Sequence, residues 1–223
     1  MVSNRWEEEV YSQSKQINRY PFDKVVSKVL SVKRNLPKPL TALDIGSGTG
    51  NHLNFFVDNG FDTTGIELSK SANKLAESFL NANNNKAKIY EGNIIFPEQF
   101  FRDEKFSFIL DRGSLTHNSY KNVKNALGAF SKLMHDEGRF LSYFFSSENP
   151  SIKSSKLISD NYYTDFVCGI FKGLRLPTLF LSQNEDEILF GEYFKLIELN
   201  HLSTYNTIDQ DHSSHMWEIY CKL

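Results

Sequence analysis

Three glycines occupy alternate positions directly after an apolar run, at Gly46, Gly48 and Gly50, and Asp44 stands two residues ahead of the first. Glycine lets a backbone turn tightly and lets a ligand approach it closely. A strand that turns here into a helix leaves backbone N–H groups without partners inside the helix. We therefore expect the amides of residues 46–50 to face a bound ligand. The alternative is a tight turn that binds nothing.

The spacing of these glycines narrows the type of ligand. The dinucleotide fingerprint G-x-G-x-x-G would place its third glycine at position 51, where this chain has Asn51. A phosphate-binding P-loop requires Gly-Lys-Ser or Gly-Lys-Thr, and the chain has neither after these glycines. Glu67 lies 21 residues after Gly46, at the end of the next strand-like run. A carboxylate there can accept hydrogen bonds from both hydroxyls of a ribose. The alternative is that Glu67 is an ordinary exposed acid at a strand end that binds nothing.

Strand-like and helix-like segments alternate along the chain, which indicates an α/β fold with a largely parallel sheet. We expect strands at 41–45, 61–67, 87–91, 106–110 and 139–145, and helical stripes at 22–30, 53–57, 72–80 and 123–134. No helix fits between the last two strands, 193–199 and 215–221, so these should pair antiparallel. Ser69 and the pair Ser182 and Glu185 have the residue types of helix N-terminal caps.

The whole chain, residues 1–223, is predicted to form a single domain. Within it, N-terminal helices at 1–38 precede a binding core at 39–145. An irregular, aromatic-rich insertion follows at 146–181, and a helix with a β-hairpin completes the chain at 182–223.

The glycine motif with its preceding acid, together with Glu67, resembles motif I and the next acidic position of the class I S-adenosylmethionine-dependent methyltransferases. Supporting segments are Glu91-Gly92-Asn93-Ile94, Asp111-Arg112-Gly113-Ser114-Leu115-Thr116-His117 and Met134-His135-Asp136-Glu137-Gly138-Arg139-Phe140. The resemblance covers residues 40–145 well and the C-terminal hairpin loosely. It implies a Rossmann-like methyltransferase sheet of seven strands, mostly parallel with an antiparallel C-terminal hairpin, and helices on both faces. The stretches NRYPFDKVVS and DRGSLTH are similar to bacterial small-molecule methyltransferases.

The resemblance implies S-adenosylmethionine as the cofactor and S-adenosylhomocysteine as its product. It assigns the cofactor-binding role to Asp44, Gly46, Ser47, Gly48, Gly50, Asn51, Glu67, Leu68, Gly92, Asn93, Ile94, Asp111 and Arg112. Leu68 is placed to pack on the adenine face. The family often has an aspartate where this chain has Asn93, whose amide oxygen can accept the same hydrogen bond.

Methyl transfer from a sulfonium is an in-line displacement, in which alignment can supply roughly 7–11 kcal/mol of the barrier. A catalytic side chain is useful only where the acceptor must lose a proton. His117 is our candidate for the base because histidine titrates near neutrality, and its alternative role is to cap a helix or bind a backbone carbonyl. Asp111 could bind an ammonium group or the acceptor, or be purely structural. Arg112 could bind a carboxylate, or be solvated.

Two further segments are candidates to cover the site. In this family an N-terminal segment folds over the cofactor as a lid, and here it carries Tyr11, Gln16, Asn18, Arg19 and Tyr20. The insertion offers Tyr162 and Phe166 for an acceptor pocket. The alternatives are ordinary surface packing for the first group and a hydrophobic mini-core for the second.

Composition restricts the partners. The net charge is −2, so no overall basic field favours nucleic acid. Cys168 and Cys221 are far apart and not in a metal-like spacing, so we predict reduced thiols, a cytoplasmic location and no metal site. A metal-assisted catechol-type enzyme would have carboxylates after the fourth and fifth strands. Asp111 and Glu148 match this pattern only weakly. The N-terminus is too polar for a signal peptide, and no apolar run approaches the roughly 20 residues of a membrane helix.

The predicted function is methylation of a small molecule, on oxygen or nitrogen. A protein or RNA methyltransferase, a non-catalytic S-adenosylmethionine-binding protein and a nicotinamide oxidoreductase are the alternatives. The sequence does not predict the acceptor, the atom methylated, the use of a general base or the oligomeric state.

Overall fold

A computed structural model describes residues 5–13, 17–173, 175–209 and 212–223 of the chain. Contacts within the chain divide it into two compact units. The first unit comprises residues 1–110, 132–139 and 223, and the second comprises residues 111–131 and 140–222. The fold is mixed α/β and Rossmann-like, as predicted.

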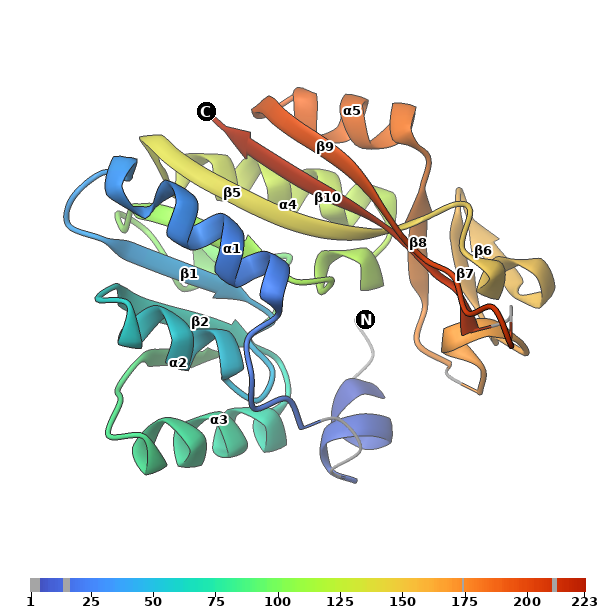
Figure 1. Ribbon diagram of the computed structural model, residues 1–223, viewed down its shortest axis with the longest axis horizontal. Helices are drawn as coiled ribbons and strands as arrows, with labels where there is room; N and C mark the ends of the chain where they lie inside the picture. The colour runs from blue at the N-terminus through green and yellow to red at the C-terminus, as the bar shows by residue number, and fades with distance from the viewer. Residues whose placement is uncertain (1–4, 14–16, 174, 210–211) are drawn as a thin grey trace. The chain divides into compact units, whose positions relative to one another are not determined.

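A sheet with parallel pairing runs through the first unit. Its strands follow the order β3 (Lys88–Glu91), β2 (Asp62–Glu67), β1 (Thr41–Ile45) and β4 (Phe106–Asp111), as Figure 1 shows. β1 pairs with β2, and β2 with β3, in parallel register. Parallel neighbours need a crossover connection, which α2 (Asn51–Asp58) and α3 (Lys70–Ala82) supply. The carboxyl ends of these strands therefore meet at one edge, where the predicted site residues follow them.

Local sequence explains both crossover helices. α3 begins after Ser69, whose hydroxyl accepts a hydrogen bond from the Ala72 amide at 3.0 Å, which confirms the predicted cap. Ala72, Ala76 and Leu80 recur at helical spacing and are buried. α2 ends before Gly60, whose φ of 77° lets the chain leave the helix.

Aromatic packing dominates the core of the first unit. Phe56 of α2 and Phe108 of β4 are fully buried, with ring centroids 5.8 Å apart. Phe61 meets Phe56 edge to face at 5.2 Å. Burying one such side chain contributes about 1.5–3 kcal/mol to stability. The remaining elements of this unit are η1 (Trp6–Tyr11), α1 (Asp23–Val32), η2 (Lys33–Asn35) and η3 (Pro97–Gln99).

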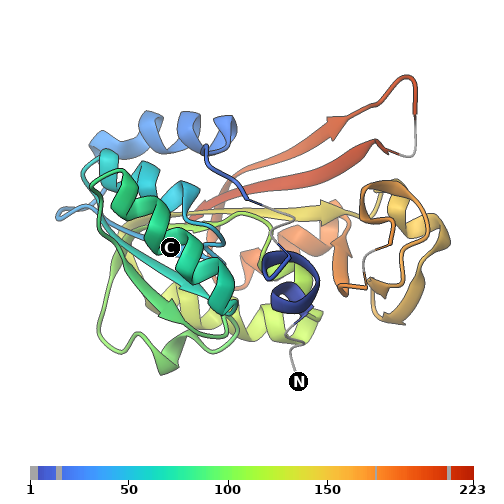
Figure 2. The ribbon, with the colours of Figure 1, turned by 90° about the horizontal axis from the view of Figure 1, so that it is seen from below.

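The second unit contains antiparallel strand pairs. β5 (Met134–Ser146) enters this unit at residue 140 and pairs antiparallel with β10 (Ser214–Lys222). β10 in turn pairs antiparallel with β9 (Lys195–Thr204), and Figure 2 shows these two strands running side by side as a ribbon. The predicted antiparallel pairing of the last two strands is thus confirmed. This unit also holds η4 (Leu115–His117), α4 (Tyr120–Lys132) and α5 (Gln183–Gly191). α5 begins with the predicted capping box of Ser182 and Glu185.

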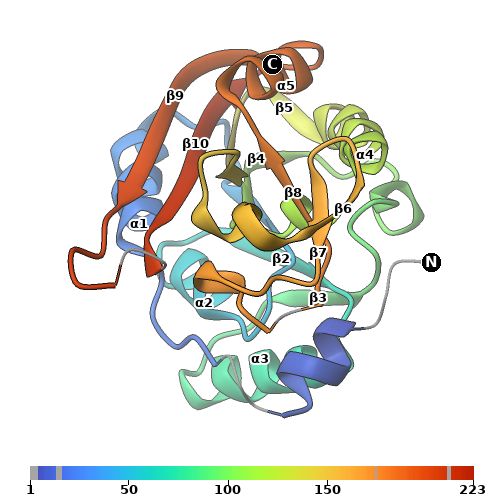
Figure 3. The same cartoon turned by 90° about the vertical axis from the view of Figure 1, so that its right-hand side faces the viewer.

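The insertion is more ordered than its sequence suggests. Residues 146–181 hold η5 (Pro150–Ser154), β6 (Lys156–Ser159), β7 (Tyr162–Thr164), η6 (Gly169–Phe171) and β8 (Thr178–Leu181), seen face-on in Figure 3. β8 pairs parallel with the end of β5 and antiparallel with β7. The described residues therefore form ten strands, three more than predicted. All four residues of β6 are exposed, so this strand lacks the apolar alternation that would reveal it.

No helix among the described residues has the length and apolar character that crossing a membrane requires.

The start of β5 differs from its prediction, because the strand begins at Met134 instead of residue 139. The segment 134–138 resembles the family's turn into this strand, but in the structure it is the first part of the strand itself.

Packing at Gly92 gives a test of the first unit. An ideal Cβ at Gly92 would lie 2.1 Å from Cζ of Phe100. We expect Gly92→Ala to lower the free energy of unfolding by about 1–3 kcal/mol, because overpacking forces neighbours to shift. Gly191→Ala is the matched control, since the nearest atom to its Cβ would be 3.8 Å away. Urea denaturation measures both, and wild-type stability of Gly92→Ala would contradict the steric argument.

Candidate functional site

The glycine loop needs glycine for its backbone. Gly46, Gly48 and Gly50 have φ angles of 68°, 52° and 83°, in the left-handed region that side chains with a Cβ avoid. Gly50 is also the N-cap of α2, and a Cβ there would lie 2.9 Å from the Cβ of Ala76. The alternating glycines therefore fix a tight turn from β1 into α2.

Most amides of this loop already have acceptors. The N–H groups of Gly46 and Ser47 donate to the carbonyl of Ile66 at 2.8 and 3.3 Å, and that of Gly50 donates to Ser47 O at 3.0 Å. Gly48 N donates to Oε2 of Glu67 at 3.1 Å. Our expectation of open amides is wrong at these four positions, because β2 and the loop itself supply acceptors.

Glu67 joins three parts of the first unit. It ends β2, its Oε2 accepts from Gly48 N, and its Oε1 accepts from Ser69 N at 2.8 Å. The side chain is buried, and burial raises the pKa of its carboxyl, although the backbone N–H groups of Ser69 and Gly48 act in the opposite direction. The two strongest sequence signals, the glycines and the acid that follows β2, are therefore in direct contact.

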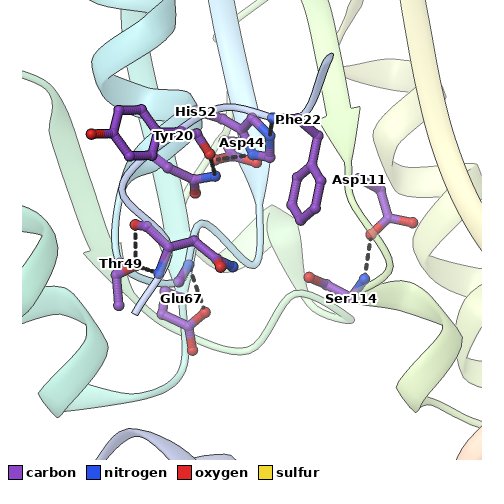
Figure 4. Close-up of polar contacts among 11 residues, drawn as sticks. Tyr20, Phe22, Asp44, Thr49, His52, Glu67, Asp111 and Ser114 are labelled. Carbon is purple, nitrogen blue, oxygen red and sulfur yellow. Dashed lines mark hydrogen bonds and ion pairs between the residues drawn. The ribbon is translucent and has the colours of Figure 1, made fainter. Parts of the chain in front are cut away.

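Asp44 lies beneath the loop with a histidine partner. Its Oδ2 is 4.0 Å from Nδ1 of His52, and both side chains are buried. His52 Nε2 accepts a hydrogen bond from the Phe22 amide at 3.4 Å, as Figure 4 shows. Asp44 thus holds an imidazole that reaches the N-terminal segment.

The N-terminal segment docks on the glycine loop through backbone atoms. Thr49 Oγ1 donates to Asn18 O at 2.9 Å and accepts from Asn18 N at 3.2 Å. Asn51 Nδ2 donates to Tyr20 O at 2.9 Å (Figure 4). These bonds, with the one to Phe22, bind the chain at residues 18–22 to the start of α2.

Two side chains of η1 complete the contact. The Tyr11 hydroxyl lies 2.9 Å from the position that a Cβ of Gly48 would take. Burial and the nearby Glu67 carboxylate raise the pKa of Tyr11. Glu7 Oε2 accepts from Ser71 N at 3.0 Å, and its carboxylate also accepts from the hydroxyls of Ser69 and Ser71. Its negative charge lies at the N-terminus of α3, where the helix dipole favours an anion.

The side chains of Arg19 and Tyr20 lie elsewhere, although Tyr20 contributes its carbonyl. Arg19 places its guanidinium over the ring of Phe79, 4.9 Å from the centroid. The side chain of Tyr20 is 86% exposed. Gln16 lies outside the described residues.

The residues after β3 are held by local contacts. Gly92 N donates to the backbone carbonyl of Glu67 at 3.0 Å, which brings the ends of β2 and β3 together. Asn93 Oδ1 accepts from Ile95 N at 3.2 Å, within its own turn. Ile94 is buried and Leu68 is half-buried.

In the second unit, Asp111 organises the turn that follows β4. Its Oδ1 accepts from the amides of Ser114 (Figure 4) and Leu115 at 2.8 and 3.0 Å, and its Oδ2 accepts from the Ser142 hydroxyl at 2.7 Å. The side chain is fully buried, and burial raises the pKa of its carboxyl to about 6. These contacts support a purely structural role for Asp111.

The next two candidates also have partners in the second unit. The Arg112 guanidinium lies 4.7 Å from the centroid of the Tyr143 ring. His117 Nδ1 is 3.1 Å from the Thr178 hydroxyl, and burial lowers the pKa of this imidazole to about 4. His117 is therefore neutral near pH 7.

Tyr162 and Phe166 of the insertion have different surroundings. The Tyr162 hydroxyl donates to the backbone carbonyl of His117 at 3.3 Å, and burial raises its pKa to about 12. Phe166 is buried in a cluster with Phe171 and Phe180. The mini-core alternative therefore describes Phe166, whereas Tyr162 stays beside a candidate catalytic residue.

Comparison with known proteins decides the family. The family described as "Methyltransferase domain" matches residues 15–172, well over half of the chain. The chain belongs to the class I S-adenosylmethionine-dependent methyltransferases. It is therefore an enzyme family member with S-adenosylmethionine as its cofactor, which leaves no support for the nicotinamide alternative. No protein with a curated function is similar enough in sequence to match.

Solved methyltransferase structures share the fold. An S-adenosylmethionine-dependent methyltransferase from Clostridium acetobutylicum is 16% identical, with a TM-score of 0.67 over 90% of this chain and 89% of its own. The 1,6-didemethyltoxoflavin-N1-methyltransferase of Burkholderia thailandensis is 16% identical, with a TM-score of 0.63 and coverages of 89% and 76%. Magnesium protoporphyrin IX methyltransferase from Synechocystis, with bound S-adenosylhomocysteine, is 14% identical, with a TM-score of 0.69 and coverages of 99% and 97%.

Four residues that contact the predicted site residues or the N-terminal segment were not among our candidates: Glu7, Thr49, His52 and Ser69. Ser69 had been recognised only as a helix cap. Glu7 lies in a run of three glutamates, in which only the contact with α3 distinguishes it. Thr49 stands inside the glycine motif and His52 directly after Asn51, so their position next to predicted site residues was the available signal.

Glu7 provides a test of the N-terminal segment. We expect Glu7→Ala to speed hydrogen exchange at the Ser71 amide and proteolysis of residues 5–13 by about tenfold, because the anchor on α3 is lost. Glu8→Ala is the matched control, since the neighbouring Glu8 side chain is exposed. Equal protection in Glu7→Ala and wild type would show that η1 is held without this carboxylate.

The low pKa of His117 gives a pH test. The folded state binds a proton on His117 only near pH 4, whereas the unfolded chain binds it near the ordinary value of 6.5. The unfolded state therefore gains protons first, and stability falls as the pH falls from about 6.5 to 4. We expect His117→Gln to remove about 2 kcal/mol of this loss between pH 7.5 and 4.5, measured by urea unfolding. His212→Gln serves as the control, and a pH profile of His117→Gln parallel to wild type would contradict the shift.

Proposed function

We propose that this methyltransferase transfers the methyl group of S-adenosylmethionine to a small molecule, on oxygen or nitrogen. The observation that carries the proposal is the buried Glu67 carboxylate in contact with the glycine loop at Gly48 N. A nucleoside ligand presents a diol to such an acid and an amino-acid tail to such a loop. The net charge of −2 favours a small acceptor over RNA.

The residues of the first unit fit the cofactor. Glu67 accepts from the backbone amides of Gly48 and Ser69, and the Leu68 amide also stabilises its charge. An ionised carboxylate has about four acceptor positions, so capacity remains for a ribose hydroxyl. Gly46 and Gly48 present backbone without a Cβ, against which the amino-acid tail can lie.

The rest of the predicted cofactor set divides by role in this proposal. Leu68, Asn93 and Ile94 surround the adenine, because they follow β2 and β3 at the same sheet edge as Glu67. Asp44 and Asn51 act indirectly, because one holds His52 and the other holds Tyr20 O of the N-terminal segment. Ser47, Gly50 and Gly92 keep the backbone in place.

Tyr11 is assigned the role of a cover. Its hydroxyl lies against Gly48, the surface on which the tail of the cofactor would rest. Cofactor entry therefore requires η1 to release Tyr11, and its return would exclude water from the reacting atoms. Exclusion of water strengthens the electrostatic interactions inside a site.

Catalysis in this proposal depends mainly on alignment. The cofactor supplies the activated methyl group and its leaving group, so the protein must hold the acceptor in line. His117 is neutral near pH 7 and can accept a proton from a hydroxyl acceptor, although a pKa of about 4 makes it a weak base. A carboxylate acceptor would need no base. Asp111 and Arg112 position the turn that carries His117, and Tyr162 lies beside it.

Structural relatives support a small acceptor. The Burkholderia structure contains 1,6-didemethyltoxoflavin, and the Synechocystis enzyme is named for magnesium protoporphyrin IX. Both names specify a small molecule, which supports a small acceptor for this chain.

Glu67→Gln tests the cofactor contact. The amide keeps the shape of the side chain but loses the charge and one acceptor oxygen, so we expect calorimetry to show S-adenosylhomocysteine binding at least tenfold weaker. Glu91→Gln is the matched control, because Glu91 is the exposed acid that ends β3. Unchanged affinity of Glu67→Gln, with a folded protein by circular dichroism, would contradict this assignment.

A labelled-methyl experiment tests the acceptor class. The protein is incubated with methyl-labelled S-adenosylmethionine and separate small-molecule, protein and RNA fractions of a cell extract. We expect label only in the small-molecule fraction, and Glu67→Gln should abolish it. Label in the protein or RNA fraction would overturn the proposal, and cofactor binding without any transfer would favour the non-catalytic alternative.

A further inference from the structure

Three side chains of the second unit gather their ligand atoms in one place. Glu148, His201 and His215 each offer one atom, and these three atoms lie within 4.8 Å of one another. Glu148 follows β5, while His201 lies on β9 and His215 on β10. Glu148 lies 53 positions before His201, and His215 lies 14 positions after it, so no short spacing pattern predicted a metal site.

The hairpin register puts both imidazoles on one face. His201 pairs with Trp217, and His215 pairs with Ser203, so the two histidines are diagonal neighbours. The rings of His201 and Trp217 stack with centroids 4.3 Å apart. Trp217 is itself fixed, because its indole N–H donates to Leu181 O at 2.8 Å. The orientation of the His201 ring is therefore set by packing before any ligand binds.

His215 is held by a hydrogen bond at one ring nitrogen. Its Nδ1 lies 2.9 Å from the Ser203 hydroxyl, and the residue is 5% exposed. A hydrogen bond to one ring nitrogen that leaves the other for the ion is the usual arrangement of metal-binding histidines.

His201 supplies an independent observation. Its Nε2 is buried and has no hydrogen-bond partner among the described residues. A buried polar atom without a partner costs free energy, and such atoms call for an explanation. A cation coordinated at this histidine would provide one.

Glu148 supplies a carboxylate that can move. Its side chain is exposed, whereas its backbone amide donates to Ser146 Oγ at 3.2 Å. The ligands of one tetrahedral zinc ion lie about 3.3 Å apart, given bonds of about 2.0–2.2 Å. Rotation of this exposed side chain can shorten the distances from its carboxylate to the two imidazoles.

We propose that Glu148, His201 and His215 bind a divalent transition-metal ion of the zinc class. Two imidazoles and one carboxylate match the preference of zinc, whereas calcium and magnesium prefer oxygen ligands alone. Three protein ligands leave a fourth position for water or another small ligand. The ion would cross-link β9, β10 and the segment after β5.

Metal titration of tag-free protein tests the site. We expect wild type to bind one equivalent of Zn²⁺ by equilibrium dialysis, and Co²⁺ to give the visible absorption of a tetrahedral complex. The double variant His201→Gln, His215→Gln should bind at least a hundredfold more weakly. His212→Gln is the matched control, because this exposed histidine lies near the same hairpin tip and pairs with Asp209.

Glu148→Gln keeps the test valid if the double variant does not fold. This exposed substitution should leave the metal-free thermal unfolding unchanged, while it weakens Zn²⁺ binding at least tenfold and alters the Co²⁺ spectrum. The proposal is overturned if wild type binds no stoichiometric Zn²⁺, or if His212→Gln weakens binding as much as Glu148→Gln. The assay needs no S-adenosylmethionine, so its outcome is independent of the methyl-transfer proposal.

Discussion

The first unit depends on the carboxylate of Glu67. One of its oxygens holds the glycine loop after β1, and the other holds the start of α3 after β2. A buried acid is costly unless hydrogen bonds compensate for lost water. Backbone amides give that compensation here, so the same contacts that keep the acid in place also fix the loop geometry. The loop geometry is consequently fixed by contacts within the chain, and pre-organisation of this kind reduces the ordering cost of binding.

The N-terminal segment covers the glycine loop and Glu67. Residues 18–22 bind to the loop and to α2 mainly through their own backbone atoms, while the partner atoms are the side chains of Thr49, Asn51 and His52. η1 adds Glu7 on α3 and Tyr11 on Gly48. The covering segment is thus attached at several separate points, each of modest strength. Such a segment can detach in steps while the sheet beneath it stays intact.

The sequence predicted the alternating elements, the glycine turn and the acid after β2, because each rests on a local pattern. α3 began at the predicted cap, Ser69, and the last two strands paired antiparallel. The expectation of open amides was wrong at four of the five positions, since their acceptors are atoms of Ile66, Glu67 and Ser47, which a loop motif does not reveal. β6 was missed because its four residues are exposed. The single-domain organisation and the roles of the site residues stay predictions.

Contacts made by backbone atoms could not be predicted from the sequence. Asn18 and Tyr20 were candidates for their side chains, yet it is their carbonyls that bind Thr49 and Asn51. Any residue carries a carbonyl, so residue type holds no information about such bonds. The same limit applies to Glu148, His201 and His215, whose proximity arises from strand pairing between distant segments.

The cluster of Phe166, Phe171 and Phe180 gives the insertion a hydrophobic centre of its own, with Phe145, Ile152 and Tyr163 packed around it. A segment that buries its own aromatic rings does not rely on its outward-facing residues for order. Substitutions at those outward positions are therefore expected to leave the fold of residues 146–181 intact. What this surface contacts can change while the contact between Glu67 and the glycine loop stays as it is.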